Sequence, residues 1–298
     1  MTDNDETPVD PGPVVEITEP GVYEMTNDQY HADPVPGGSL SSTGARALLP
    51  PGCPAQYRYD RDHPPETKDH FDLGHAAHML VLGAGPELVV IDADNWTTKA
   101  AKQARAEARA EGLTPLTRPQ NERVCAMAAA LRAHPFAGLL FDHDRGQPEA
   151  SLFWVDPQTG VWCRARFDFL PDRIPGARMI IPDYKTAAAV DLDALSRSCA
   201  TWGYFAQDAW YRMGAQALGL ADADARFVLV CQAKDPPHLV TVIEVDHVAQ
   251  RLGHQLNRQA LQLYAQCKES GRWPGHADDV VSLSLPPWFE NAMGAHEL

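Results

Sequence analysis

The chain has 298 residues, of which 44% are hydrophobic, and its 40 acidic and 25 basic side chains give a formal net charge of −15. This length and composition suffice for one compact domain with a sizeable core, although two domains are also possible. No run of eighteen apolar residues occurs, which argues against a membrane-spanning helix. So acidic a chain does not have the composition of a general nucleic-acid binder.

Residues 1–20 are polar, acidic and rich in proline, and we expect them to form a disordered tail before a single domain over residues 21–298. They contain no apolar stretch of the kind found in a signal peptide, so a cytoplasmic protein is expected. The six cysteines are scattered without any Cys-x-x-Cys pair. This spacing argues against a zinc site or an iron–sulfur cluster.

The first predicted helix follows Ser41 or Ser42 as N-cap and carries Arg46 about one turn inside. Hydroxyl groups and an arginine at a helix N-terminus can bind a phosphate, such as the 5′-phosphate of a DNA end. An ordinary capped helix with a solvated arginine is the alternative. A second, almost wholly apolar helix over residues 73–82 contains His75 and His78. A histidine in such a helix is more often a hydrogen-bonded core residue than a metal ligand.

A strongly helical, alanine-rich stretch over residues 99–109 places Lys102, Arg105 and Arg109 on one face. A solvated face is the simpler interpretation, and a face directed at DNA or at another subunit is the alternative. The next helix is predicted to begin after Thr117, with Pro119 in its first turn, and to run to about His134.

Alternating β-branched and aromatic residues predict four strands, the first two joined as a hairpin. Their expected bounds are Glu149–Val155, Val161–Leu170, Arg178–Lys185 and Arg226–Cys231. One long helix is predicted over Leu192–Leu218, with Trp202, Tyr204, Phe205 and Trp210 in the core. An edge strand over Leu239–Val245 and a helix over Val248–Ser270 complete the pattern. The expected fold is α+β, an α/β sandwich with a mixed central sheet flanked by helices and with helical N-terminal elaborations.

Two carboxylates and a lysine are predicted to meet at the ends of the central strands. Asp183 and Lys185 are two residues apart and share a strand face, and Asp168 ends the preceding strand. Carboxylates suit a hard cation such as Mg²⁺, and a lysine beside the metal can orient a water for phosphodiester hydrolysis. An Asp-x-Lys triplet by itself is more often a solvated strand end. However, a buried strand should not end in two charges without partners.

The order of these residues resembles the RecB-like branch of the PD-(D/E)xK nuclease superfamily, and within it the RecE-type exonucleases (exodeoxyribonuclease VIII) of phages and prophages. The resemblance covers roughly residues 20 to 290 and extends to segments near both ends of that range. The matching pattern is Gly74-x-x-x-His78, Glu149, Asp168, Asp183-x-Lys185 and Gln207-x-x-x-Tyr211, with further likeness at Tyr30-His31, Gly38–Thr43, Pro54–Tyr57, Trp273–Gly275 and Leu285–Trp288.

The resemblance implies a restriction-endonuclease-like core and a role for each matching residue. The implied catalytic residues are Asp168, Asp183, Lys185 and Glu149. The implied ligands of Mg²⁺, with Mn²⁺ as a substitute, are His78, Asp168, Asp183 and the backbone carbonyl of Tyr184, and His75 competes weakly with His78. The residues expected to bind substrate are Gln207, Tyr211, Arg164, Ser42 and Arg46.

The resemblance also implies a function and partners. The expected activity is a 5′-to-3′ exonuclease on linear double-stranded DNA that leaves 3′ tails for recombination, inside the host bacterium. The expected partners are DNA ends, further copies of the chain in a ring, and a RecT-like annealing protein. A basic surface confined to such a ring would reconcile DNA binding with the acidic composition. The alternatives are a related endonuclease or single-strand nuclease, or a non-catalytic DNA-binding subunit of the same fold.

Overall fold

The computed structural model describes residues 16–64, 73–85 and 87–292, with the helix assignment alone for residues 73–75 and 292. Most of the predicted tail, residues 1–15, lies outside these ranges. Residues 16–20 are described, and there Ile17 is fully buried and donates its N–H to the carbonyl of Pro34 at 2.9 Å. The packed part of the chain therefore includes residue 17, which was predicted to belong to the tail.

One sheet is built around the predicted hairpin of β5 (Gly146–Val155) and β6 (Trp162–Pro171), which pair antiparallel. The strand β1 (Gly21–Tyr23) pairs with β5, and β2 (Leu40–Ser41) pairs parallel with β6, giving the order β1-β5-β6-β2. The turn is closed by Asp156, whose carboxylate accepts the N–H of Thr159 at 2.9 Å. The predicted hairpin is confirmed.

The second sheet consists of β7 (Ile180–Ala187), β8 (Arg226–Ala233) and β9 (Val240–Ile243), with β7 parallel and β9 antiparallel to β8. Among the described strands β6 and β7 lie side by side without pairing. The prediction of one continuous central sheet is therefore wrong in this detail. The two sheets meet at a seam, where the side chain of Asp168 on β6 accepts the N–H of Tyr184 on β7 at 2.6 Å.

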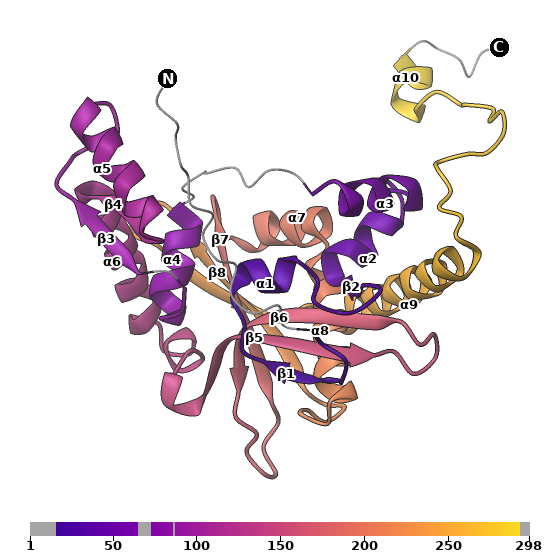
Figure 1. Ribbon diagram of the computed structural model, residues 1–298, viewed down its shortest axis with the longest axis horizontal. Coiled ribbons are helices and arrows are strands. Elements are labelled where there is room, and N and C mark those ends of the chain that lie inside the picture. The colour runs from indigo at the N-terminus through magenta and orange to yellow at the C-terminus, as the bar shows by residue number, and fades with distance from the viewer. Residues whose placement is uncertain (1–15, 65–72, 86, 293–298) are drawn as a thin grey trace, which may run out of the picture.

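Helices cover both faces of these sheets (Figure 1). On one face lie α2 (Ser42–Leu48), α8 (Tyr204–Ala217) and α9 (His247–Ser270), and on the other α4 (Leu73–Leu82) and α6 (Arg118–Ala133). Side chains of β8 point alternately to its two faces, and both faces are buried. Leu229 and Cys231 pack in the core with α2, α8 and α9, and Val230 packs in the core with α4 and α6. Fully burying a side chain such as Leu229 stabilises the fold by about 1.5–3 kcal/mol. The predicted α+β sandwich is confirmed.

The remaining elements elaborate this core. A parallel pair, β3 (Leu88–Ile91) and β4 (Thr114–Thr117), is connected by α5 (Lys99–Ala110). Thr117 caps α6 in a capping box with Gln120, as its position before Pro119 predicted. The short helices are α1 (Asn27–His31), α3 (Pro54–Asp62), two 3₁₀ turns (Ala137–Leu139 and His143–Arg145) and α10 (Pro287–Ala292), which lies away from the body of the molecule (Figure 1).

The helix predicted over residues 192–218 is two helices, α7 (Leu192–Trp202) and α8, so that prediction is wrong. Gly203 adopts φ 70°, a left-handed conformation that glycine tolerates without steric cost, and it ends α7. The break turns Trp202 outward with 58% of its surface exposed, against the prediction that it lies in the core. Trp210, in the middle of α8, is fully buried as predicted.

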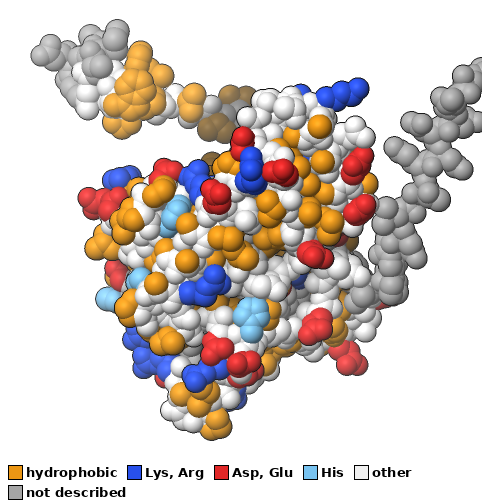
Figure 2. Space-filling view, turned by 90° about the vertical axis from the view of Figure 1, so that its left-hand side faces the viewer, with side chains coloured by type: hydrophobic (Ala, Val, Ile, Leu, Met, Phe, Trp, Pro, Cys, Tyr) orange, Lys and Arg blue, Asp and Glu red, His pale blue; other side chains and the backbone are white. Residues whose placement is uncertain are grey.

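The predicted basic face of α5 makes contacts within the chain. The guanidinium of Arg105 lies over the ring of Trp96, 5.2 Å from its centroid. On the side of the molecule that carries α5 and α6, basic and acidic side chains are interspersed among apolar ones (Figure 2). This distribution favours the solvated-face interpretation. Among the described helices none combines the length and the apolar character needed to cross a membrane.

Candidate active site

A cleft of about 1300 Å³ lies at the seam between the two sheets. Residues of β5, β6 and β7 line it together with α4 and the segment around α1. Four side chains predicted for the site, His78, Glu149, Asp168 and Lys185, share its lining with Tyr184. The tertiary structure thus gathers residues that are more than 100 positions apart in the sequence.

Asp168 is held at the seam by neutral and basic donors. One carboxylate oxygen accepts the N–H of Tyr184, and the other lies 3.1 Å from Nε2 of His78. Burial by itself would raise the pKa of Asp168, but the charges of His78 and Lys185 and these hydrogen bonds outweigh it and hold that pKa below its ordinary value. Asp168 is therefore ionised over the whole neutral range.

His78 lies between two carboxylates. Its Nδ1 is 3.4 Å from Glu149 and its Nε2 faces Asp168. Burial would lower the pKa of His78, but the two carboxylates outweigh burial and raise it above the ordinary value. His78, which the resemblance implies to be a metal ligand, thus faces the cleft from α4. The side chain of His75 lies outside the described part of the molecule.

Asp183 is almost completely buried, with 1% of its side chain exposed, and it faces α8. One oxygen lies 2.5 Å from Nζ of Lys185 and the other accepts the amide of Gln207 at 2.7 Å. Burial, reinforced by the charge of Asp168, raises the pKa of Asp183 to about 6 against the opposing effect of Lys185. Burial would lower the pKa of Lys185, but Asp183 and Asp168 raise it. The predicted shared face of the Asp-x-Lys pair is present.

Glu149 sits at a distorted point of β5. In the register it lies across from Asp168, since the flanking pairs are Pro148 with Phe169 and Ala150 with Phe167. Its φ of 54° is left-handed, which for a residue other than glycine costs on the order of 1–3 kcal/mol and must be stabilised by its surroundings. The hairpin thus departs from regular strand geometry where the site lies.

Arg166 is a residue of the cleft that sequence reasoning did not assign. Its Nε lies 2.5 Å from Glu149, and its terminal nitrogen donates to Ser151 at 2.7 Å. Its position two residues before Asp168, on the same strand face, is the sequence signal that could have identified it. Of the two arginines on β6, it was Arg164 and not Arg166 that was predicted to contact substrate. In the described structure it lines neither the cleft nor the pocket beside it, and it binds Asp33 at 2.6 Å.

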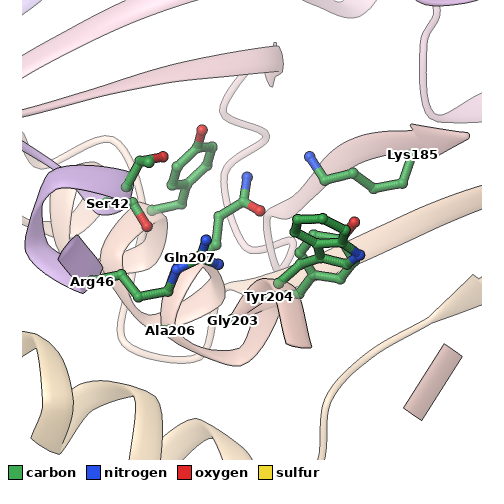
Figure 3. A pocket seen from close by; sticks show the side chains of 10 residues that line it. Ser42, Arg46, Lys185, Gly203, Tyr204, Ala206 and Gln207 are labelled. Carbon is green, nitrogen blue, oxygen red and sulfur yellow. The ribbon is translucent and has the colours of Figure 1, made fainter. Parts of the chain in front are cut away.

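A smaller pocket of about 430 Å³ adjoins Lys185 at the N-terminal end of α8 (Figure 3). It is lined by Gln207 and Tyr211, four residues apart on α8, and by Ser42 and Arg46 of α2. These four are the remaining residues predicted to bind substrate. Figure 3 shows Ser42 and Arg46 on one side of the pocket and Lys185 on the other, with Gln207 between them.

Local contacts set the role of each polar side chain in this pocket. The N-cap of α2 is Ser41, whose hydroxyl accepts the N–H of Gly44 at 3.1 Å, so Ser42 is free of that role. Arg46 passes closely over Gly203, where an added Cβ would lie 2.8 Å from its Cδ. Tyr211 donates its hydroxyl to the carbonyl of Arg166 at 2.8 Å and thereby anchors α8 to β6.

The carboxylates and the histidine of the site are suitable ligands for a divalent cation, although they contact other protein groups in this structure. In the described residues no three His, Cys, Asp or Glu side chains form a ready-made metal site. Lys185 and Gln207 contact the two oxygens of Asp183, and Tyr184 donates to one oxygen of Asp168. Two buried carboxylates that repel each other, beside a histidine, are nevertheless the ligand chemistry that a hard cation stabilises. The residues therefore fit such an ion.

Neighbouring strands that carry two acids and a lysine, enclosed between two helical layers, are typical of a PD-(D/E)xK-type domain. A sequence model described as "PDDEXK-like domain of unknown function (DUF3799)" matches residues 46–285, and the chain belongs to this family. It is thus a member of the PD-(D/E)xK nuclease superfamily.

Among solved structures, the chain is similar to the crystal structure of a "Putative exonuclease" from Eubacterium rectale. The TM-score is 0.53 at 11% identity, and the match covers 91% of this chain and 98% of the other. At this identity the likeness shows the shared fold. A comparison with curated proteins finds no match.

Proposed function

We propose that this protein is a metal-dependent exonuclease that degrades linear double-stranded DNA from the 5′ end, as the RecE-type exonucleases do. The observation that carries the proposal is that Asp168 and Lys185 line one cleft at the seam of the two sheets, while the buried Asp183 contacts Lys185 directly behind it. Two acids and a lysine in this arrangement are the groups that metal-assisted phosphodiester hydrolysis requires.

Mg²⁺, or Mn²⁺ in its place, would be held by Asp168, Asp183, His78 and the backbone carbonyl of Tyr184, with Glu149 nearby. When bound, such an ion polarises the scissile phosphate and lowers the pKa of a coordinated water. Nucleases of this superfamily generally use divalent metals, which supports the assignment.

The side chains around these acids have separate tasks in the proposed reaction. Lys185 keeps its proton at neutral pH, so its ammonium group can orient the attacking water or stabilise the charge that develops on the phosphate. Gln207 holds Asp183 through one oxygen, and Arg166 holds Glu149. Both are positioning residues, because their contacts lie on other side chains of the site.

The pocket beside Lys185 is the proposed binding site for the 5′-phosphate of the DNA end. Arg46 supplies a guanidinium fork and Ser42 a hydroxyl, and both line the pocket within the same two turns of α2. Charge-assisted hydrogen bonds of this kind are roughly twice as strong as neutral ones. A phosphate held next to the catalytic lysine would favour cleavage near the 5′ end.

The biological setting is proposed from the resemblance to RecE-type enzymes and from the fold shared with a protein described as an exonuclease. In that setting the protein works in the cytoplasm of a bacterium, encoded by a phage or prophage. It forms a homo-oligomeric ring around DNA, and the 3′ tails that it exposes are taken up by a RecT-like annealing protein.

The test is an assay of end-labelled linear duplex and covalently closed circular duplex, each with Mg²⁺ and with EDTA. We expect the linear substrate to be degraded from its 5′ ends with Mg²⁺, and the circular one to persist. Cleavage of the circle would identify an endonuclease, and preference for denatured DNA a single-strand nuclease. DNA binding with no cleavage in any metal would identify a non-catalytic subunit.

A further inference from the structure

A large aromatic side chain lies exposed beside the catalytic lysine. Trp202 has 58% of its surface exposed and lines the same 430 Å³ pocket as Lys185 and Arg46. Exposure of a tryptophan at a polar site is informative, because burying an indole is strongly favourable and the neighbouring Trp210 is fully buried. The structure thus leaves apolar ring surface open to a ligand at this point.

The exposure follows from the break between α7 and α8. The predicted single helix would have passed through Gly203. In the structure, the left-handed conformation of Gly203 ends α7 directly after Trp202. Arg46 lies close to this turn, since a Cβ added at Gly203 would be 2.8 Å from its Cδ. The turn therefore brings the cationic Arg46 and the aromatic Trp202 to one pocket.

The lining of this pocket combines two kinds of surface. One part is polar and basic, and is formed by Ser42, Thr43 and Arg46 of α2. The other includes the rings of Trp202 and Tyr204, and Nζ of Lys185 lies 5.6 Å from the centroid of Tyr204. Anionic ligand groups suit the first surface and flat aromatic groups the second. A nucleotide carries both, and the volume lies in the range of small-molecule binding pockets.

We propose that Trp202 is a stacking platform for a nucleobase, the base of the 5′-terminal nucleotide whose phosphate is held by Ser42 and Arg46. This inference rests on the proposed function and adds a base-binding subsite to it. A terminal base pair is stacked on one side only, so an indole can cover its open face. Every base has such a face, which makes the contact independent of sequence.

The experiment compares Trp202→Ala with wild type on two linear duplexes, one with ordinary 5′-terminal nucleotides and one with abasic 5′-terminal positions that keep their phosphate. Steady-state cleavage with Mg²⁺ gives kcat and KM for each. Trp202→Phe tests rescue by a smaller ring. Leu192→Ala is the matched control, because Leu192 is 70% exposed at the other end of α7 and does not line the pocket.

We expect Trp202→Ala to raise KM for ordinary ends about 10-fold, the range of a base stacked on an aromatic side chain, with a smaller change in kcat. The same variant should leave KM for abasic ends within about 2-fold of wild type, because no base is there to stack. Trp202→Phe should restore most of the loss, and Leu192→Ala should match wild type on both substrates.

Three outcomes would overturn the stacking role: equal loss on ordinary and abasic ends, no rescue by phenylalanine, or wild-type behaviour of Trp202→Ala. Each would leave the exonuclease assignment standing, since wild type would still degrade linear duplex. Failure of wild type to cleave any DNA would instead remove the proposed function, and the stacking role with it.

Discussion

The two halves of the site treat their carboxylates in opposite ways. On the side of α4, Asp168 is surrounded by His78 and the N–H of Tyr184, and its pKa is held low. On the side of α8, Asp183 is buried against Lys185 and Gln207, and its pKa is raised to about 6. The surroundings of Asp168 thus favour its ionised form, whereas the burial of Asp183 disfavours its ionised form.

The largest expected effect is the loss of cleavage on removing either carboxylate. Asp168→Ala and Asp183→Ala should each lower kcat by about 1000-fold or more, since each removes a charge that the metal and the developing phosphate charge depend on. Steady-state cleavage of linear duplex measures the loss, and circular dichroism checks that the fold persists. Full Mg²⁺-dependent activity of folded Asp183→Ala would refute the mechanism.

His78 should affect metal binding more than DNA binding. His78→Ala removes the imidazole between Asp168 and Glu149, and we expect the Mg²⁺ concentration for half-maximal rate to rise about 10- to 100-fold. Duplex binding in EDTA, followed by fluorescence anisotropy, should change little. An unchanged Mg²⁺ dependence would make His78 a structural residue of α4.

The opposite pKa shifts predict distinct pH dependences of stability without metal. Because the pKa of folded Asp183 is about 6, above that of the unfolded chain, folding takes up a proton between about pH 4 and 6. The associated stability is complete below about pH 4 and falls by about 2 kcal/mol as pH rises to 6. For Asp168, whose pKa is lowered, stability is instead lost as pH falls below about 4.

Urea unfolding in EDTA at several pH values measures this difference. Asp208 also has a raised pKa of about 6, so the informative quantity is wild type minus Asp183→Asn. That difference should decrease as pH rises from 4 to 6. A difference that does not vary with pH would mean that Asp183 is not under the predicted electrostatic stress.

The smallest expected effect lies at the pocket beside the seam. Arg46→Ala should reduce the preference for 5′-phosphorylated over 5′-hydroxyl ends by about 10-fold, the loss of one charge-assisted contact, and keep cleavage itself. Competition between the two ends in one assay measures the preference. Arg178→Ala, at an exposed ion pair with Asp224, is the control. Equal loss on both ends, or none, would make Arg46 a structural partner of Gly203.

Local patterns in the sequence account for the elements and for part of the site. Period-two alternation predicted β5 to β8, and the caps at Ser41 and Thr117 predicted the starts of α2 and α6. The spacing of Asp183 and Lys185 placed them on one strand face. These features depend on neighbours a few residues away, which is why sequence alone could determine them.

The tertiary structure decided what depends on distant partners. The pairing of Arg164 with Asp33 and of Arg166 with Glu149 separates two arginines that look alike in the sequence. Asp168 bridges two sheets where one had been predicted, because its carboxylate takes the place of backbone pairing to β7. Arg46, 157 positions before Gly203, passes over the turn between α7 and α8 and shares a pocket with Trp202. Such contacts are set by packing between elements, and no local pattern encodes them.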